Sequence, residues 1–78
     1  MSISAERKPI RATSLLFRAD KLVVALDDGR EIAVPVNWFR RLASATPEQR
    51  ANYRFIAGGL GIHFPDIDED ISVEALLR

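Results

Sequence analysis

The segment KLVVALDDGREIAVPV, residues 21–36, constrains the fold more than any other stretch of the chain. Apolar side chains recur at every second position before and after its central Asp-Asp-Gly, and such alternation is typical of half-buried β-strands. An Asp-Gly pair between two alternating runs is a strong signal for a β-hairpin. We therefore predict two antiparallel strands here, with Gly29 in the left-handed conformation of the turn.

The alternation also predicts the register of this hairpin. A two-residue loop would place Leu26 opposite Glu31 and mix a charge with apolar side chains on one face. A three-residue loop over Asp-Asp-Gly instead places Leu22 opposite Val34, so that one face is uniformly apolar. We predict this second register. Pro35 has no N–H, so the second strand should end there or lie at a sheet edge.

The segments around the hairpin predict another strand and two short helices. Leu15 and Phe17 alternate with Ser14, Leu16 and Arg18 as in a half-buried strand. Asn37 is a good N-cap for a helix to about Ala43. Trp38 and Leu42 would then lie one turn apart on the same helix face.

The second helix has the clearest start in the chain. Thr46 as N-cap, Pro47 at the first helical position and Gln49 three residues after the cap form a capping box. Ala51 with Phe55, and Tyr53 with Ile56, form apolar pairs at helical spacing. We expect glycine at position 58 or 59 to end this helix, since glycine adopts the left-handed C-terminal conformation at little cost.

The C-terminal part predicts a strand followed by a helical turn. LGIHF, which contains Gly61, is predicted to form a short strand with Ile62 and Phe64 separated by His63, and Pro65 should end it. Ser72 or Asp70 would cap the final turn, SVEALL. The order of elements predicts an α+β domain over residues 11–78, a small antiparallel sheet with helices covering one face, after a flexible N-terminus over residues 1–10.

Composition narrows the class of protein. The chain has 78 residues and no cysteine, so its stability must come from core packing or from a partner subunit, and a homodimer would be one such partner. It shows no signal peptide and no membrane-spanning run, so we expect a cytoplasmic protein that does not bind membranes.

Charge is balanced overall but not along the chain. Residues 1–44 carry eight Lys and Arg against five acidic residues, and residues 45–78 carry three against six. This distribution argues against a dedicated nucleic-acid binder, which usually has a strong basic excess. It suits self-association, a charged protein partner, or simply two halves that face each other within one fold.

Two longer stretches, DDGREIAVPVNWFRRLASATPEQR and GLGIHFPDIDEDISVEALL, resemble the bacterial family called domain of unknown function 2442. The resemblance covers residues 12–78. It departs from the common pattern at Phe39-Arg40, where an aromatic-Pro pair is usual, and at Phe64, where Trp is usual. The residues that carry it are Asp28, Gly29, Arg30, Pro35, Trp38, Phe39, Arg41, Leu42, Ala45, Thr46, Pro47, Glu48, Arg50, Gly59, Gly61, Ile62, Phe64, Pro65, Asp68, Glu69, Asp70, Ile71, Ser72, Val73, Leu76 and Leu77.

This resemblance implies a small α+β protein without an established catalytic activity. Members of the family often occur beside another small protein, in the manner of toxin–antitoxin pairs. The resemblance therefore implies a protein partner, and it implies no cofactor.

The segment DIDED has the outward form of a metal-binding loop. Asp66, Asp68 and Asp70 stand at positions 1, 3 and 5 of an EF-hand loop. However, Ile71 replaces the glycine required at position 6, and Leu77 replaces the glutamate at position 12. We therefore predict no metal site, and expect these acidic side chains to precede and cap the last helix.

Two other features also favour structural roles over chemistry. The glycines of GGLG follow a predicted helix and precede a strand, the reverse of a phosphate-binding loop, so we interpret them as a close approach between backbones. His63 is the only histidine, and no nucleophile is recognisable beside it. We expect it on the outer face of the last strand, and we predict no catalytic residue.

The candidate interaction surface combines arginine, tryptophan and carboxylate side chains. Arginine and tryptophan are enriched in the hot spots of protein interfaces. The same arginines could instead grip phosphates or pair internally with the carboxylates. We expect a non-catalytic protein-interaction module, antitoxin-like in its setting, with a nucleic-acid-associated regulator as the alternative. The candidate residues are Trp38, Arg40, Arg41, Arg50, Arg54, Asp68, Glu69 and Asp70.

Overall fold

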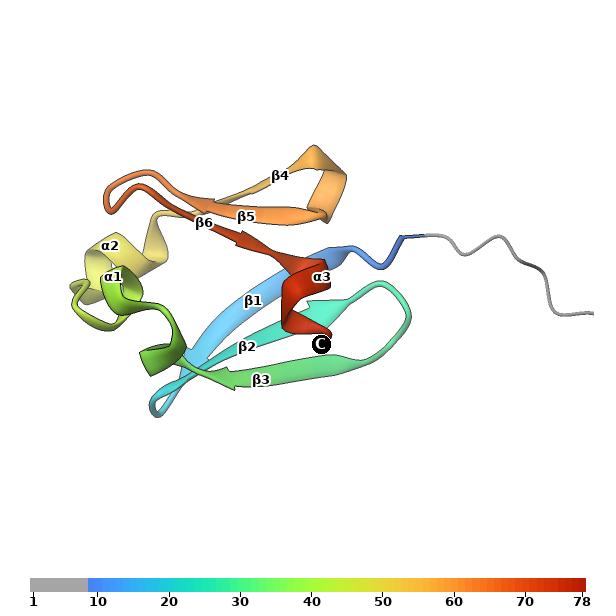
Figure 1. Cartoon of the computed structure of the whole chain (residues 1–78), viewed down its shortest axis with the longest axis horizontal. Coiled ribbons are helices and arrows are strands. Elements are labelled where there is room, and N and C mark those ends of the chain that lie inside the picture. Colours follow the sequence, from blue (N-terminus) through green and yellow to red (C-terminus); the bar gives the residue numbers. More distant parts are fainter. Residues whose placement is uncertain (1–8) are drawn as a thin grey trace, which may run out of the picture.

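The computed structural model describes residues 9–78, which form two small antiparallel sheets and several short helices (Figure 1). The expected flexible segment therefore lies mostly outside the described residues. In chain order the elements are β1 (Ala12–Arg18), β2 (Lys21–Leu26), β3 (Glu31–Pro35), the 3₁₀ turn η1 (Val36–Trp38), α1 (Arg40–Ala43), α2 (Pro47–Ala51), β4 (Arg54–Ile56), the 3₁₀ turn η2 (Ala57–Gly59), β5 (Gly61–Phe64), β6 (Glu69–Ser72) and α3 (Val73–Leu76).

The predicted α+β class is confirmed, but a second sheet covers the first. The strand orders are β1-β2-β3 and β4-β5-β6, with every neighbouring pair antiparallel. The two sheets face each other, α1 and α2 lie together at one end, and α3 follows β6 (Figure 1). The cover that we expected from helices is thus supplied largely by β4, β5 and β6.

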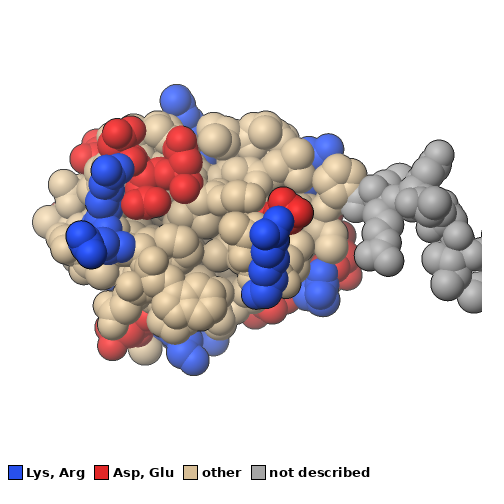
Figure 2. Space-filling model, viewed as in Figure 1, with Lys and Arg blue, Asp and Glu red and all other residues tan. Residues whose placement is uncertain are grey.

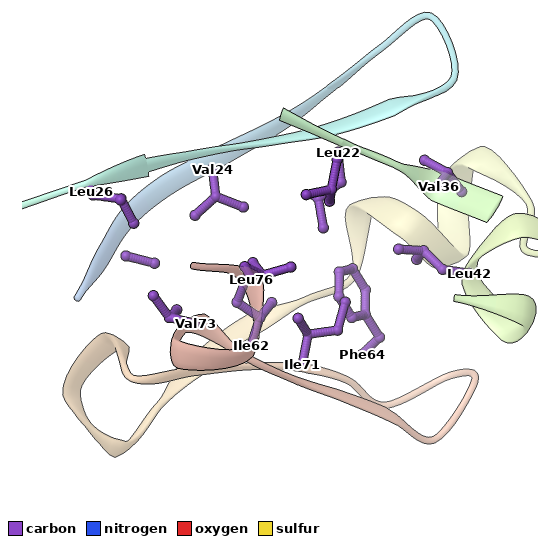
Figure 3. Close-up of a cluster of buried hydrophobic side chains, with 12 residues drawn as sticks. Leu22, Val24, Leu26, Val36, Leu42, Ile62, Phe64, Ile71, Val73 and Leu76 are labelled. Atoms are coloured by element: carbon purple, nitrogen blue, oxygen red, sulfur yellow. The ribbon is translucent and has the colours of Figure 1, made fainter. Parts of the chain in front are cut away.

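The core lies between the two sheets. Leu22, Val24 and Leu26 of β2 point toward Ile62 and Phe64 of β5 (Figure 3). These five side chains are at most 4% exposed. Burying each apolar side chain of this size is worth about 1.5–3 kcal/mol, so this layer is the main source of stability in a chain without disulfides.

The central hairpin has the predicted register. Leu22 pairs with Val34, and the N–H of Leu26 bonds to the carbonyl of Arg30 at 2.8 Å, which leaves a three-residue loop. Gly29 has a φ of 93°, in the left-handed region that this loop requires. Pro35 is the last residue of β3, which lies at a sheet edge.

The first predicted helix is shorter than expected, and Asn37 does not cap it. Asn37 lies inside η1, and Phe39, the residue before α1, is extended with φ −122° and ψ 100°. This extended residue breaks the helical spacing between Trp38 and Leu42. Trp38 is consequently 63% exposed whereas Leu42 is fully buried, so our expectation of a shared face is wrong.

The second helix begins where predicted and ends earlier. Thr46 accepts a bond from the N–H of Gln49, the Gln49 side chain accepts one from the N–H of Thr46, and Pro47 opens the helix. The helix ends at Ala51, so its expected continuation to glycine is wrong. Residues 54–56 form β4 instead and pair with β5, and the partly buried Phe55 packs against the core from this strand.

The glycines after β4 fit a close contact between backbones. A Cβ on Gly59 would lie 2.7 Å from the carbonyl oxygen of Ala12, and Gly59 has a φ of 100°. The expected close approach of backbones is therefore present, but between η2 and β1. Gly61 opens β5, which ends at Phe64, directly before Pro65.

The acidic segment forms a hairpin rather than a helix cap. Glu69 and Asp70 lie in β6, which pairs with β5. The cap of α3 is Ser72, whose hydroxyl accepts a bond from the N–H of Ala75 at 3.3 Å. Asp70, our other candidate for the cap, is therefore excluded from that role.

Candidate interaction surface

An exposed aromatic side chain stands on a turn that the core holds in place. Val36, Phe39 and Leu42 all contact the core from this turn. The side chains between them point outward: Trp38 is 63% exposed, and Arg40 is exposed as well. A large apolar ring is thus presented to solvent on backbone that its neighbours anchor. We call Trp38, Arg40 and Arg41 the tryptophan surface.

Arg41 connects the tryptophan surface to the β5–β6 turn. Its Nη1 donates to the backbone carbonyl of Asp68 at 2.6 Å. Asp68 has a φ of 53°, a left-handed conformation that Asp tolerates better than most residues. The arginine therefore pairs with the backbone of the acidic segment and not with its carboxylates.

Acidic side chains gather close to this contact. Figure 2 shows red side chains over the region where Figure 1 draws the β5–β6 turn, with blue side chains beside them. Asp68 is exposed there, and Asp66 accepts a bond from the Asn52 side chain at 3.1 Å. A partner that meets the tryptophan surface would thus encounter charges of both signs.

Arg50 is used within the fold. Its Nε donates to the carbonyl of Leu42 at 3.0 Å, and its Nη2 donates to the carbonyl of Ala43 at 3.2 Å. Its guanidinium also lies 5.4 Å from the centre of the Phe17 ring, in a cation–π contact. These contacts satisfy the C-terminal carbonyls of α1 and tie α2 to β1. We therefore leave Arg50 out of the tryptophan surface.

The remaining candidate residues lie on the second sheet. Arg54, His63 and Asp70 are cross-strand neighbours on β4, β5 and β6. The Nδ1 of His63 lies 2.5 Å from Oδ1 of Asp70. Glu69 is half-buried opposite Phe64, on the other face of the same strand. The expected outer position of His63 is thus observed, and its partner is Asp70.

The three alternate carboxylates of DIDED do not converge. Asp66 bonds to Asn52, Asp70 bonds to His63, and Asp68 lies in the turn between them. Within residues 9–78, no group of three or more His, Cys, Asp or Glu side chains is placed to hold a metal ion.

The glycine segment presents carbonyl groups. Nη1 of Arg11 donates to the carbonyl oxygens of Ala57 and Gly58, each at 3.2 Å. A phosphate-binding loop presents N–H groups to an anion, whereas this segment presents oxygen atoms to a cation. Its contacts tie η2 to the start of β1.

A comparison with family models finds a match over nearly the whole chain. The model described as "Protein of unknown function (DUF2442)" matches residues 12–78. The chain belongs to this family. A search of curated proteins finds no match.

Two solved structures resemble this DUF2442 protein. A protein of unknown function from Rhodospirillum rubrum has a TM-score of 0.77 and 24% identity, with 90% of this chain and 87% of that one covered. An uncharacterised protein from Chromobacterium violaceum, solved by NMR, has a TM-score of 0.72 and 29% identity. That match covers 86% of this chain but only 63% of the other. Both support the fold.

The described part of this DUF2442 protein contains no helix with the length and hydrophobicity needed to cross a membrane.

Sequence reasoning missed the pairing between His63 and Asp70. The signal for it was a second hairpin: Pro65 ends β5, and Asp70 and Ser72 alternate with Ile71 as in a strand. In a hairpin of this length Asp70 falls opposite His63. The expectation that the acidic residues cap the last helix leaves no place for this strand.

Proposed function

We propose that this DUF2442 protein is a non-catalytic protein-interaction module that binds a second protein through the tryptophan surface. The observation that carries the proposal is the 63% exposure of Trp38 on a turn that the buried side chains of Val36 and Leu42 anchor. Tryptophan and arginine dominate interface hot spots because they combine a large apolar area with directional polar contacts. A rigidly anchored ring also loses little conformational freedom on binding.

The partner that fits best has an apolar pocket for the indole of Trp38, and charged groups around this pocket that pair with the charged side chains beside Trp38. Arg40 is exposed and makes no side-chain hydrogen bond within residues 9–78, so its guanidinium is free to meet a carboxylate. The family resemblance supports a more specific proposal, an antitoxin-like role in which the partner is encoded by a neighbouring gene.

The arrangement favours a protein partner over nucleic acid. Phosphate backbones are bound by surfaces with a clear excess of Lys and Arg. Here acidic side chains stand beside the arginines, as Figure 2 shows, and the whole chain has no net charge. Nucleic-acid binding would require these carboxylates to approach phosphates, which is unfavourable.

The test is co-purification of the tagged chain with the products of the adjacent genes. We expect a partner to be retained, and Trp38→Ala to weaken binding at least about 30-fold, which corresponds to ~2 kcal/mol, as for other hot-spot residues. Ile56→Ala is the matched control, because Ile56 is also a large exposed apolar residue, 36% exposed, but lies on β4 outside this surface.

Two results would overturn the proposal. One is a partner that binds wild type and Trp38→Ala equally well. The other is a shift of generic duplex by the chain in low-salt gel electrophoresis that Arg40→Ala abolishes, because the arginines would then serve nucleic acid.

A further inference from the structure

The outer edge of β1 lacks the usual protection of an edge strand. β1 spans Ala12–Arg18 and is the longest strand of the described chain. Edge strands are commonly interrupted by proline or by charged side chains, which prevent pairing with another chain. Residues 13–17 of β1 read Thr-Ser-Leu-Leu-Phe and contain neither. Beyond the irregular pairing between Ala12 and Ser14, the edge from Ser14 to Phe17 is regular and uncharged, and it is a template for another strand.

The backbone groups on this edge belong to Leu15 and Phe17. The N–H of Leu26 bonds toward β3 and the N–H of Asp27 bonds to Arg11, on the β1 side. Backbone N–H and C=O groups alternate in direction along a strand. The N–H and C=O of Val23 therefore also point toward β1, and those of its partner Leu16 point toward β2. The N–H and C=O groups of Leu15 and Phe17 therefore point away from the sheet. No loop or turn backbone group of residues 9–78 bonds to them.

Leu16 adds an apolar side chain at the middle of this edge. It is 47% exposed and lies on the outer face of the sheet, across from Val23. Val23 is 5% exposed but does not belong to the core cluster between the sheets. Val23 and Leu16 thus form an apolar area on the outer face of the sheet, and Leu16 is the member of it that lies at the free edge.

We propose that β1 of a second copy of this chain pairs with β1 in antiparallel fashion, about a two-fold axis at Leu16. The two three-stranded sheets would then form one continuous sheet of six strands. Opposite residues of an antiparallel pair point to the same face, and a two-fold axis normal to the sheet keeps each face unchanged. The axis must therefore pass at a residue position and not between two residues.

An axis at Leu16 uses the free groups best. It sets Leu15 of each copy opposite Phe17 of the other, so the free N–H and C=O groups of all four residues bond. It brings the two Leu16 side chains together and sets Ser14 opposite Arg18. An axis at Arg18 would instead oppose like charges, which is unfavourable across strands. An axis nearer the N-terminus would meet the irregular pairing between Ala12 and Ser14.

The proposed register predicts the effect of charge at position 16. Leu16→Lys would place two lysines opposite each other and weaken self-association at least about tenfold in sedimentation equilibrium. Leu16→Glu would act likewise, and an equimolar mixture of the two variants should associate again, because the opposed charges then attract. Ala33→Lys is the matched control, since Ala33 is exposed on the same sheet but on β3, and it should associate as wild type does.

A cysteine at position 16 tests the contact itself. The chain has no cysteine, so Leu16→Cys introduces a single thiol. The two sulfur-bearing residues would form a non-hydrogen-bonded pair with a Cα separation of about 4.5 Å, which is within the range of a disulfide. We expect rapid disulfide-linked dimers under mild oxidation, and far slower ones from Ala33→Cys.

The proposal would be overturned by a wild-type chain that stays monomeric at millimolar concentration. It would be overturned equally by a dimer that Leu16→Lys and Ala33→Lys leave unchanged, because another surface would then be responsible. β1 and the tryptophan surface share no residue, so either result leaves the proposed function open to its own test.

Discussion

Gly59 lies where the backbone of η2 meets that of β1. Two conditions select glycine there: a φ of 100°, and a carbonyl oxygen of Ala12 only 2.7 Å from where a Cβ would lie. Gly29 meets only the first condition, since its φ is 93° and no atom lies within 4 Å of its Cβ position. A substitution at Gly29 therefore measures the cost of the backbone conformation alone, whereas one at Gly59 measures that cost together with the cost of the contact with Ala12.

We predict that Gly59→Ala destabilises the chain more than Gly29→Ala does. The left-handed conformation should cost an alanine about 1–2 kcal/mol at either position. At Gly59 the backbone must also move, and the total should reach at least ~3 kcal/mol. Urea unfolding of both variants measures the difference, and equal losses would contradict the described contact with Ala12.

The hairpin loop stabilises the charged form of the Asp28 carboxyl. The N–H of Arg30 donates to Oδ1 at 3.1 Å, and Nε of Arg30 donates to Oδ2 at 2.7 Å. The backbone bond is the main cause that lowers the pKa of Asp28 below its ordinary value, and the guanidinium adds to it.

The lowered pKa predicts a pH dependence with a definite sign. A carboxyl whose pKa is lower in the folded state stabilises the fold above its unfolded pKa, about 3.9. That contribution is lost as pH falls through the folded pKa. The stability difference between wild type and Asp28→Asn should therefore shrink below about pH 4. An NMR titration should show the Asp28 carboxyl protonating at lower pH than in an unfolded peptide of this sequence, and an unchanged midpoint would refute the assignment.

At the scale of elements, α2 depends on its first turn because it spans only Pro47–Ala51. The two bonds between Thr46 and Gln49, at 2.9 and 3.1 Å, satisfy N–H groups that a helix start leaves free. Thr46→Ala should cost about 1 kcal/mol in urea unfolding. Ser44→Ala is the control, because the Ser44 side chain makes no hydrogen bond within residues 9–78, and a similar loss there would argue against the capping box.

Elements defined by local chemistry were predictable from the sequence. The hairpin followed from the alternation around Asp-Asp-Gly, and the start of α2 followed from Thr46, Pro47 and Gln49. Each of these signals depends on residues close to one another in the chain, so no knowledge of tertiary contacts was needed.

Elements defined by distant contacts were not predictable in the same way. Residues 53–56 fit a helical pattern in isolation, yet Tyr53 and Phe55 pack edge to face at 5.7 Å, at strand spacing, beside β5. A helix from Asn37 would place Trp38 on the same face as Leu42, and nothing local reveals the extended Phe39 that turns Trp38 outward. The composition of the candidate surface was therefore easier to predict than its exposure.

At the scale of the whole molecule, an aromatic cluster joins the two sheets. The Phe64 ring of β5 lies 6.4 Å from that of Phe17 in β1, and 6.0 Å from that of Tyr53 before β4. Phe64 is fully buried, so its side chain contacts both layers and the helical end together. No single element is stable without these contacts, since all the helices are too short to persist alone.

We predict that Phe64→Ala removes a large part of the chain's stability. Truncating a buried phenylalanine costs about 3–5 kcal/mol, and a domain of this size has a total stability of roughly 4–12 kcal/mol. Leu16→Ala, at an exposed position, should change monomer stability by less than about 0.5 kcal/mol. Urea unfolding compares the two, and a small effect at Phe64 would contradict a core shared between the sheets.

In the proposed function, the exposed indole of Trp38 is the group that contacts the partner protein. Trp38 is the only tryptophan of the chain, so incorporation of fluorotryptophan yields a single fluorine NMR signal that reports on this side chain alone. In the free protein the signal should show the strong solvent-isotope shift of an exposed ring. On addition of the co-purified partner we predict a changed chemical shift and loss of that solvent effect. A complex that forms while the signal and its solvent effect stay as in the free protein would contradict the claim.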